Sequence, residues 1–146
     1  MISYLYTKKE LAVFSALACG GICKLAYRFV EIPDENEYDD IISSLEAKGY
    51  IRKDGGVIKT DLVQSYLFAM MSGYEKKRNA EHGKYTALYC RDLIVVLASD
   101  KYSPILCRVM PFRNEESLNE WIEEEHISLS EEIIYPESSE ETEEQK

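Results

Sequence analysis

The spacing of hydrophobic residues changes along the chain, from a helical period in the first half to a strand-like period after about residue 84. Residues 8–18 form the first clear segment, because apolar side chains recur on one side of a helix, at Leu11, Phe14, Leu17 and Ala18. Thr7 followed by Glu10 has the form of a capping box, and Gly20-Gly21 ends the pattern. The spacing therefore predicts a helix over residues 8–18.

A second helix is predicted over residues 35–48. Asp34 is a good N-cap with Glu37 at the third helical position, and Lys48-Gly49 is typical of a helix C-terminus. One face carries an apolar stripe at Tyr38, Ile41, Ile42 and Leu45. Residues 22–32, between the two helices, fit a helix and an alternating strand equally well, so their conformation stays open.

A hairpin and a third helix come next. Two short strands, Tyr50–Lys53 and Val57–Lys59, flank Asp54-Gly55-Gly56, a turn sequence that strongly favours a hairpin. Thr60 or Asp61 then caps a helix that Gly73 ends. We expect this helix to bury a face made of Leu62, Val63, Tyr66, Leu67 and Met70.

The second half has the pattern of a small sheet. Residues 74–83 are polar and predict a loop, and three apolar runs then predict strands in an antiparallel meander, at Tyr85–Cys90, Leu93–Ala98 and Pro104–Met110. In the third strand Arg108 is expected to point outward and Ile105, Cys107 and Val109 inward. Pro111 is expected to end the sheet. Asn114 is expected to cap a last helix whose apolar face holds Leu118, Trp121 and Ile122.

These elements predict an α+β fold. Residues 1–75 would form a winged-helix-like helical lobe with a Gly-tipped hairpin, and residues 84–126 would form the antiparallel meander and its C-terminal helix. Neither half alone buries much apolar surface, so we expect the two to share one core. Residues 136–146 are too polar to contribute to it and predict a disordered acidic tail.

Negative charge is concentrated at the C-terminal end. Residues 114–146 hold 13 of the 27 acidic residues and one lysine, a net charge of −12, which leaves 14 acidic and 16 basic residues in 1–113, a net charge of +2. The body therefore has no strongly basic field for nucleic acid, and the end would repel a polyanion.

Targeting signals and cysteine spacing add few constraints on the function. The longest uncharged apolar run, Leu93 to Ala98, is far shorter than the roughly 20 residues of a membrane helix. The first six residues lack the basic and apolar regions of a secretory signal, so we expect a cytoplasmic protein. The four cysteines lack the spacing of a redox or zinc motif, and reduced, mostly buried thiols are expected, although a contact between Cys90 and Cys107 stays open.

The sequence predicts no enzyme activity, cofactor or metal. It contains no Gly-rich phosphate loop, HExxH or GxSxG motif. Its two histidines, His82 and His126, lie in polar stretches, and nothing brings either beside a cysteine for a nucleophilic dyad.

The order of helix, glycine, strand, turn and strand over residues 43–59 resembles the second half of a winged-helix domain, in which the helix before the hairpin would enter the DNA major groove. Arg52, Lys53 and Lys59 would be the DNA contacts of such a transcription regulator. The helix itself opposes this function, because a surface that faces phosphates should be basic. Residues 34–48 have one lysine and six carboxylates, Asp34, Glu35, Glu37, Asp39, Asp40 and Glu46.

The whole chain resembles cytoplasmic proteins linked to type VII (ESX) secretion, the EspG-like group. The resemblance lies in Leu45–Ile51 leading into the hairpin, the helix after it, the run Leu93–Ala98 and the segment Pro111–Trp121 before an acidic end. It implies a non-enzymatic protein that binds secreted helical hairpins, although this chain is about half as long as the full chaperones.

Our main hypothesis is therefore a cytoplasmic protein-binding adaptor or chaperone-like protein, with Asp34, Glu37, Asp40 and Trp121 as candidate partner contacts. Eleven tyrosines fit this reading, since tyrosine is frequent at half-buried interfaces. A DNA-binding regulator is the alternative, and a toxin-immunity protein with a polyanionic end is a second alternative. The identity of the partner and a homodimeric state stay open.

Overall fold

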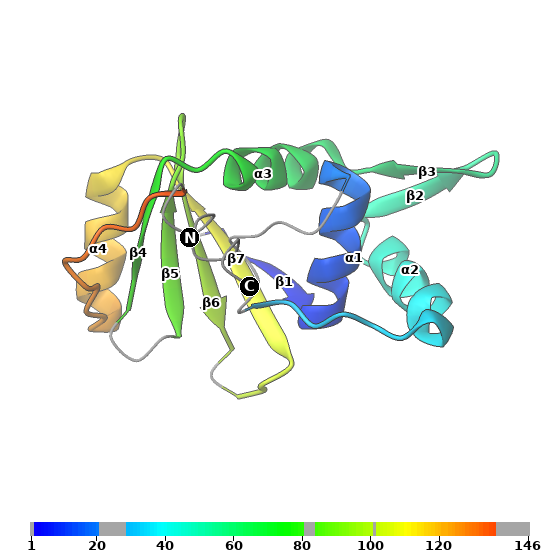
Figure 1. The fold of residues 1–146 in the computed structure, drawn as a ribbon, viewed down its shortest axis with the longest axis horizontal. Coiled ribbons are helices and arrows are strands. Elements are labelled where there is room, and N and C mark those ends of the chain that lie inside the picture. The colour runs from blue at the N-terminus through cyan, green and yellow to red at the C-terminus, as the bar shows by residue number, and fades with distance from the viewer. Residues whose placement is uncertain (1, 21–28, 81–83, 101, 137–146) are drawn as a thin grey trace, which may run out of the picture.

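The computed structural model describes residues 2–20, 29–80, 84–100 and 102–136. It confirms an α+β fold, with helices packed against a mainly antiparallel sheet (Figure 1). The elements are, in chain order, β1 (Tyr4–Thr7), α1 (Lys8–Cys19), a 3-10 turn (Glu35–Glu37), α2 (Tyr38–Ala47), β2 (Ile51–Asp54), β3 (Val57–Thr60), α3 (Leu62–Ser72), β4 (Lys76–Asn79), β5 (Tyr85–Tyr89), β6 (Ile94–Ser99), β7 (Leu106–Phe112) and α4 (Glu115–Glu125).

The main sheet pairs the first strand of the chain with the last one. Within the described residues it has five antiparallel strands in the order β1-β7-β6-β5-β4, and β2 and β3 form a separate hairpin. The predicted meander of β5, β6 and β7 is confirmed. β1 pairs with β7, with Tyr6 opposite Cys107, so the first strand lies beside the last.

The strands at the two edges of the sheet were not predicted from the sequence. β1 is only four residues long, and β4 lies in the segment that we expected to be a polar loop. The prediction of a loop over 74–83 is therefore wrong for residues 76–79. The hydrophobic pattern does not reveal β4, because an edge strand can consist of charged residues. Such charges discourage pairing with other chains. Its outer edge contacts the C-terminal segment, where the Lys77 and Ile134 backbones exchange two hydrogen bonds.

Local capping signals place the helices as the sequence predicted. The Thr7 hydroxyl accepts a 3.0 Å hydrogen bond from the Glu10 amide, and the Glu10 carboxylate accepts one of 2.9 Å from the Thr7 amide. The second helix begins with a 3-10 turn after Asp34 and then continues as α2. Gly49 has φ of +81° directly after this helix, a conformation that glycine adopts without strain.

Two predictions about β7 are wrong. Ile105 precedes the strand and is 56% exposed, whereas Cys107 and Val109 are buried as expected. Pro111 does not end the sheet, because β7 runs to Phe112 with Pro111 opposite Val95. The missing N–H of proline is tolerated there, since β1 pairs with residues 106–109 only and β7 is an edge beyond them.

The predicted buried face of α3 is wrong for three of its five residues, whereas Leu67 is buried as expected and Met70 is partly buried. Leu62 is 84% exposed, Val63 51% and Tyr66 44%. The buried face is instead made of Gln64, Leu67, Phe68 and Met71, which share the spacing i, i+3, i+4, i+7. This orientation buries Leu67, Phe68 and Met71, and it places Gln64 where its side chain accepts a 2.5 Å hydrogen bond from the buried Tyr6 hydroxyl.

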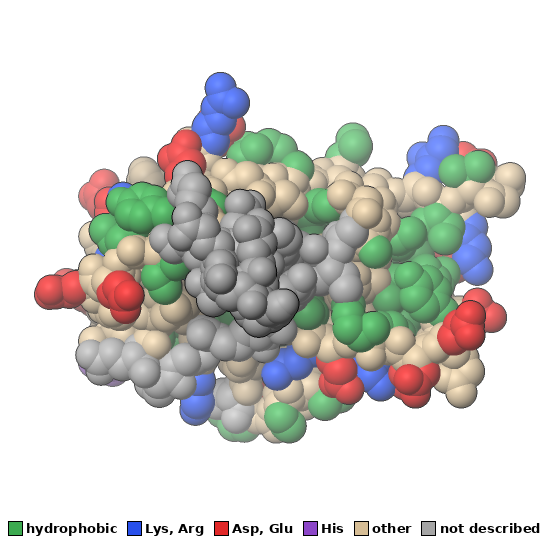
Figure 2. Space-filling model, in the orientation of Figure 1, with side chains coloured by type: hydrophobic (Ala, Val, Ile, Leu, Met, Phe, Trp, Pro, Cys, Tyr) green, Lys and Arg blue, Asp and Glu red, His purple; other side chains and the backbone are tan. Residues whose placement is uncertain are grey.

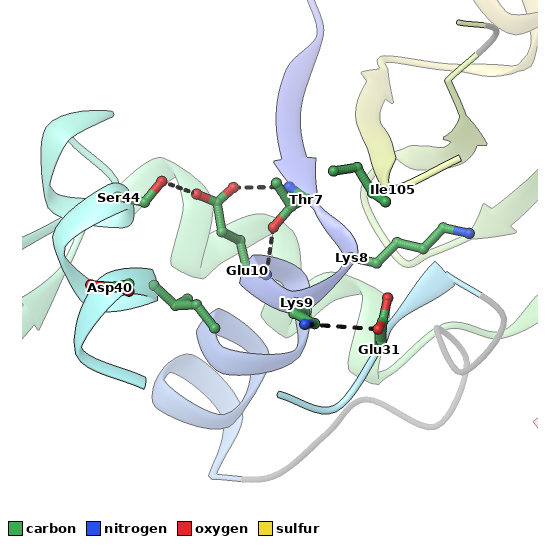
Figure 3. A pocket seen from close by; sticks show the side chains of 9 residues that line it. Thr7, Lys8, Lys9, Glu10, Glu31, Asp40, Ser44 and Ile105 are labelled. Atoms are coloured by element: carbon green, nitrogen blue, oxygen red, sulfur yellow. Dashed lines mark hydrogen bonds and ion pairs between the residues drawn. The ribbon is translucent and has the colours of Figure 1, made fainter. Parts of the chain in front are cut away.

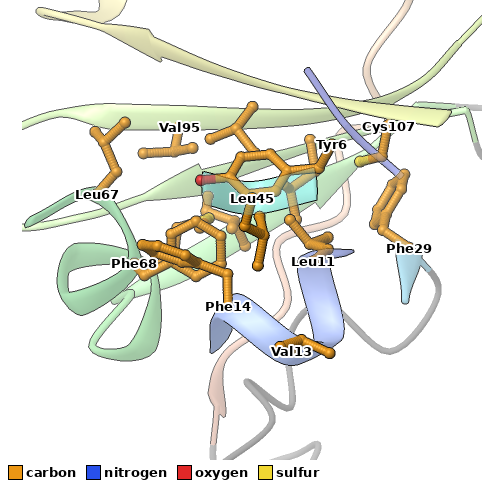
Figure 4. Packing of buried hydrophobic residues seen from close by; sticks show 14 of the residues in the cluster. Tyr6, Leu11, Val13, Phe14, Phe29, Leu45, Leu67, Phe68, Val95 and Cys107 are labelled. Carbon is orange, nitrogen blue, oxygen red and sulfur yellow. The ribbon is translucent and has the colours of Figure 1, made fainter. Parts of the chain in front are cut away.

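One hydrophobic core contains residues of both halves of the chain. Tyr6, Phe14 and Phe68, from β1, α1 and α3, form a cluster of three rings whose centroids lie 4.9 to 5.9 Å apart (Figure 4). The same core includes Val95 of β6 and Cys107 of β7. A smaller cluster on the opposite face of the sheet holds Leu118 and Trp121 of α4. The helical lobe and the sheet therefore pack as one unit.

Candidate functional site

The most unusual surface of the molecule combines one side of α3 with the β2–β3 hairpin. Its apolar members are Val57, Ile58, Leu62, Val63 and Tyr66, which are 38 to 84% exposed. Its cations are Arg52, Lys53 and Lys59 on the hairpin. Cross-strand partners share a face of the hairpin, so Arg52, Val57 and Lys59 lie on one face and Lys53 and Ile58 on the other. We call these eight residues on the hairpin and α3 the hairpin–α3 surface. In the space-filling view, hydrophobic, basic and acidic side chains are mixed at this end of the molecule (Figure 2).

The hairpin register concentrates positive charge. Arg52 is directly opposite Lys59, a like-charge pair that disfavours the hairpin by itself. Lys59 Nζ lies 3.3 Å from Asp54 Oδ2, which offsets part of this repulsion. Both cations line a groove of about 460 Å³ together with Leu62 at the start of α3. Glu46 and Asp61 line the same groove, so the exposed leucine lies beside two cations and two acidic residues.

The acidic candidates Asp34, Glu37 and Asp40 lie at the start of α2. Asp34 and Asp40 are exposed, and Glu37 is partly buried. The Lys9 ammonium donates a 2.7 Å hydrogen bond to Glu37, which lowers the pKa of the Glu37 carboxyl and raises the pKa of Lys9. Glu37 thus holds the start of α2 against α1, while Asp34 and Asp40 face solvent.

Trp121, the fourth candidate partner contact, lies far from these carboxylates. It is 8% exposed and packs on the sheet, with its ring centroid 5.4 Å from that of Phe112. Figure 1 shows α4 at one end of the molecule and α2 at the other. The structure therefore does not bring the four sequence-predicted residues together.

A cavity of about 320 Å³ lies at the start of α1 (Figure 3). Its central group is the buried carboxylate of Glu10, which accepts hydrogen bonds from the Thr7 amide, the Ser44 hydroxyl and, at 2.5 Å, the Lys48 ammonium. Lys48 also donates to the Leu5 carbonyl at the edge of β1. These contacts join β1, α1 and α2, and they leave Glu10 no obvious capacity for acid–base work.

Reactive side chains are not gathered at these surfaces. Cys90 and Cys107 are buried, and burial raises the pKa of the Cys107 thiol to about 12, which keeps it protonated. His126 is exposed at the end of α4, and His82 lies outside the described residues. Within the part of the chain that the structure describes, no three His, Cys, Asp or Glu side chains are arranged to hold a metal ion.

Sequence reasoning missed the hairpin–α3 surface because it assigned Leu62, Val63 and Tyr66 to the core. A signal was present, since Gln64, Leu67, Phe68 and Met71 form a second stripe at helical spacing, but a glutamine at one of its positions argued against burial. The burial of Gln64 makes sense only with Tyr6 in place, which is far away in the sequence.

Comparison with known proteins adds no assignment. No protein-family model, curated protein or solved structure matches this chain. The resemblances to winged-helix and type VII secretion-associated proteins therefore stay predictions from the sequence. In the described residues, no helix is long and apolar enough to cross a membrane.

Proposed function

We propose that the protein is a non-enzymatic adaptor that binds another protein through the hairpin–α3 surface. The observation that carries this proposal is the orientation of α3, which exposes Leu62 and Val63 while it buries a glutamine. Contiguous exposed apolar side chains with a polar rim are typical of protein interaction sites. A helix that only needed to be soluble would gain from polar residues at these positions.

The charge of the surface defines the partner. The hairpin carries three exposed cations, Arg52, Lys53 and Lys59, against one carboxylate, Asp54, and charges of opposite sign favour association. The partner is therefore expected to present apolar side chains flanked by carboxylates. An amphipathic helix with an acidic border has this chemistry. The resemblance to type VII secretion-associated proteins makes a secreted helical hairpin the first partner to test.

Replacing Leu62 with aspartate should abolish partner capture and leave the fold intact. Leu62 is 84% exposed and occupies the first position of α3, where the helix dipole stabilises a carboxylate. Loss of an interface anchor costs about 2 kcal/mol, roughly 30-fold in affinity. The measurement is quantitative capture from native lysate with the wild type and the variant side by side, after circular dichroism has verified the fold of both.

The matched control is Ile105→Asp, because Ile105 is also exposed and precedes β7 rather than belonging to this surface. A stoichiometric species that the wild type and Ile105→Asp retain, and that Leu62→Asp loses, supports the proposal. A species that all three retain would contradict it, as would the absence of any stoichiometric species.

DNA binding is the second candidate function, and the exposed cations Arg52, Lys53 and Lys59 on the hairpin favour it. The charge of α2 opposes it, because Asp39, Asp40 and Glu46 are exposed on the helix that would enter the groove. α2 itself contains no lysine or arginine.

We expect no mobility shift of duplex DNA even at about 50 mM salt, where non-specific affinity is greatest. Charge reversal at Arg52, Lys53 and Lys59 should then change nothing in this assay. A shift that the triple reversal removes would favour the DNA-binding regulator over the adaptor.

A further inference from the structure

A hollow of about 230 Å³ lies between α4 and the end of the sheet, away from the hairpin–α3 surface. Its floor follows from the strand register, which aligns Tyr85, Ala98 and Arg108 in one row across β5, β6 and β7. Ala98 is the smallest of the three and lies in the middle. A small side chain between two large ones, with α4 above, leaves the space that forms the hollow.

The walls of the hollow are rich in aromatic rings. Tyr85 and Trp121 are packed edge to face, with centroids 5.6 Å apart and an interplanar angle of 78°. Tyr102 adds a third ring that is 89% exposed, and the buried side chain of Met110 contributes a thioether. Trp121 is held in place by Phe112 behind it, so the Tyr85–Trp121 corner is built before any ligand arrives.

The described residues that line the hollow carry one cation, Arg108, and two carboxylates, Asp100 and Glu125. Arg108 Nε lies 3.4 Å from Asp100 Oδ1, and its guanidinium also donates to the Ser3 hydroxyl at 3.3 Å. The Arg108–Asp100 pair is therefore neutral as a unit. Glu125, exposed on the last turn of α4, adds a carboxylate. An anionic ligand would meet the exposed Glu125 carboxylate, whereas a cation would meet it together with the negative faces of the rings.

We propose that this hollow binds a methylated ammonium group. Aromatic rings attract a cation within about 6 Å of their centroids, and recognition of quaternary ammonium groups by such rings is a recurring use of this attraction. The hollow is smaller than the roughly 300–1,000 Å³ of sites for drug-sized ligands, which suits a compact head group. Two sources share this chemistry, free choline and the side chain of a methylated lysine in a protein.

The test is a titration of the intact protein with choline and, separately, with a short peptide that contains trimethyllysine. Binding is detected by the change in fluorescence of Trp121, the only tryptophan in the sequence. We expect saturable binding of at least one probe, and at least about tenfold weaker binding of the peptide with unmethylated lysine. Binding of both probes indicates recognition of the head group alone. Binding of the peptide alone indicates a modified protein. If neither probe binds at concentrations up to about 10 mM, any affinity is too weak to matter and the proposal is overturned.

Two variants test whether the ligand binds in the hollow. Ala98→Leu fills the space, and Glu125→Gln removes the exposed carboxylate without disturbing the core. Ala98→Leu should weaken binding at least about tenfold, and Glu125→Gln, which removes an exposed charge, about two- to fivefold. Glu124→Gln is the matched control, because Glu124 is also exposed on α4 but does not line the hollow. If Ala98→Leu fails to fold, the comparison of Glu125→Gln with Glu124→Gln decides the question. Equal affinities in these two variants would overturn the site. The outcome does not depend on the adaptor function proposed above.

Discussion

Replacing Phe68 with alanine should destabilise both halves of the chain together, by about 3 to 5 kcal/mol. Phe68 is 1% exposed, and its ring centroid lies 4.9 Å from that of Phe14 and 5.6 Å from that of Tyr6. These rings belong to α3, α1 and β1, and the same core contains residues of β5, β6 and β7. A void left there removes contacts from the helical lobe and from the sheet alike.

Two probes can follow the two halves during urea unfolding. Trp121 fluorescence reports on α4 and the sheet, and far-UV circular dichroism reports on all helices. With one shared core, both transitions should move to lower urea by the same amount. Tyr66→Ala, on the exposed side of the same helix, is the control and should change stability little. A Trp121 transition that stays in place while the dichroism transition moves would show two independent units.

Replacing Glu10 with alanine should cost about 3 kcal/mol of stability, the second large effect that we expect. The carboxylate is 2% exposed and accepts hydrogen bonds from three donors, on Thr7, Ser44 and Lys48. Removing it leaves these donors without their acceptor. This loss of stability is at the low end of the range for breaking a buried ion pair, because the Lys48 side chain is 29% exposed and can be hydrated again. Urea unfolding of the variant measures the effect.

Glu37 provides a matched control for Glu10. Each carboxylate lies three residues after a capping residue and accepts a hydrogen bond from that residue's backbone amide, and each is paired with a lysine. They differ in burial, since the Glu37 side chain is 36% exposed. Glu37→Ala should therefore cost far less than Glu10→Ala. Equal losses would mean that burial of Glu10 contributes nothing to stability, and the cavity beside it would need another explanation.

Signals that act over a few residues predicted most of the fold. The capping boxes at Thr7 and Asp34, the Asp54-Gly55-Gly56 turn and the N-cap at Asn114 each settle a boundary locally, and the structure places helices and strands beside them. The α+β class followed from these elements. Their strength lies in backbone hydrogen bonds between neighbours in the sequence, which no distant residue needs to complete.

Features that depend on distant partners were not predictable in this way. β1 is a strand because β7 offers it an edge, and β4 is one because β5 does. Neither segment has the apolar alternation that would show this in the sequence. The burial of Gln64 on α3 makes sense only with Tyr6 in place, because the buried Tyr6 hydroxyl needs the acceptor that Gln64 supplies. The candidate site was missed for the same reason, since its apolar members were assigned to the core.

The central claim is that the hairpin–α3 surface is where a partner protein binds, and crosslinking in native lysate tests it most directly. A photoreactive phenylalanine analogue would replace Tyr66 on this surface or, as the control, Tyr135 near the C-terminal end. The two tyrosines are similar in chemistry and exposure, at 44% and 49%. We expect a discrete crosslinked species from position 66 that is absent from position 135. Crosslinks that are the same at both positions, or absent from position 66, would contradict it.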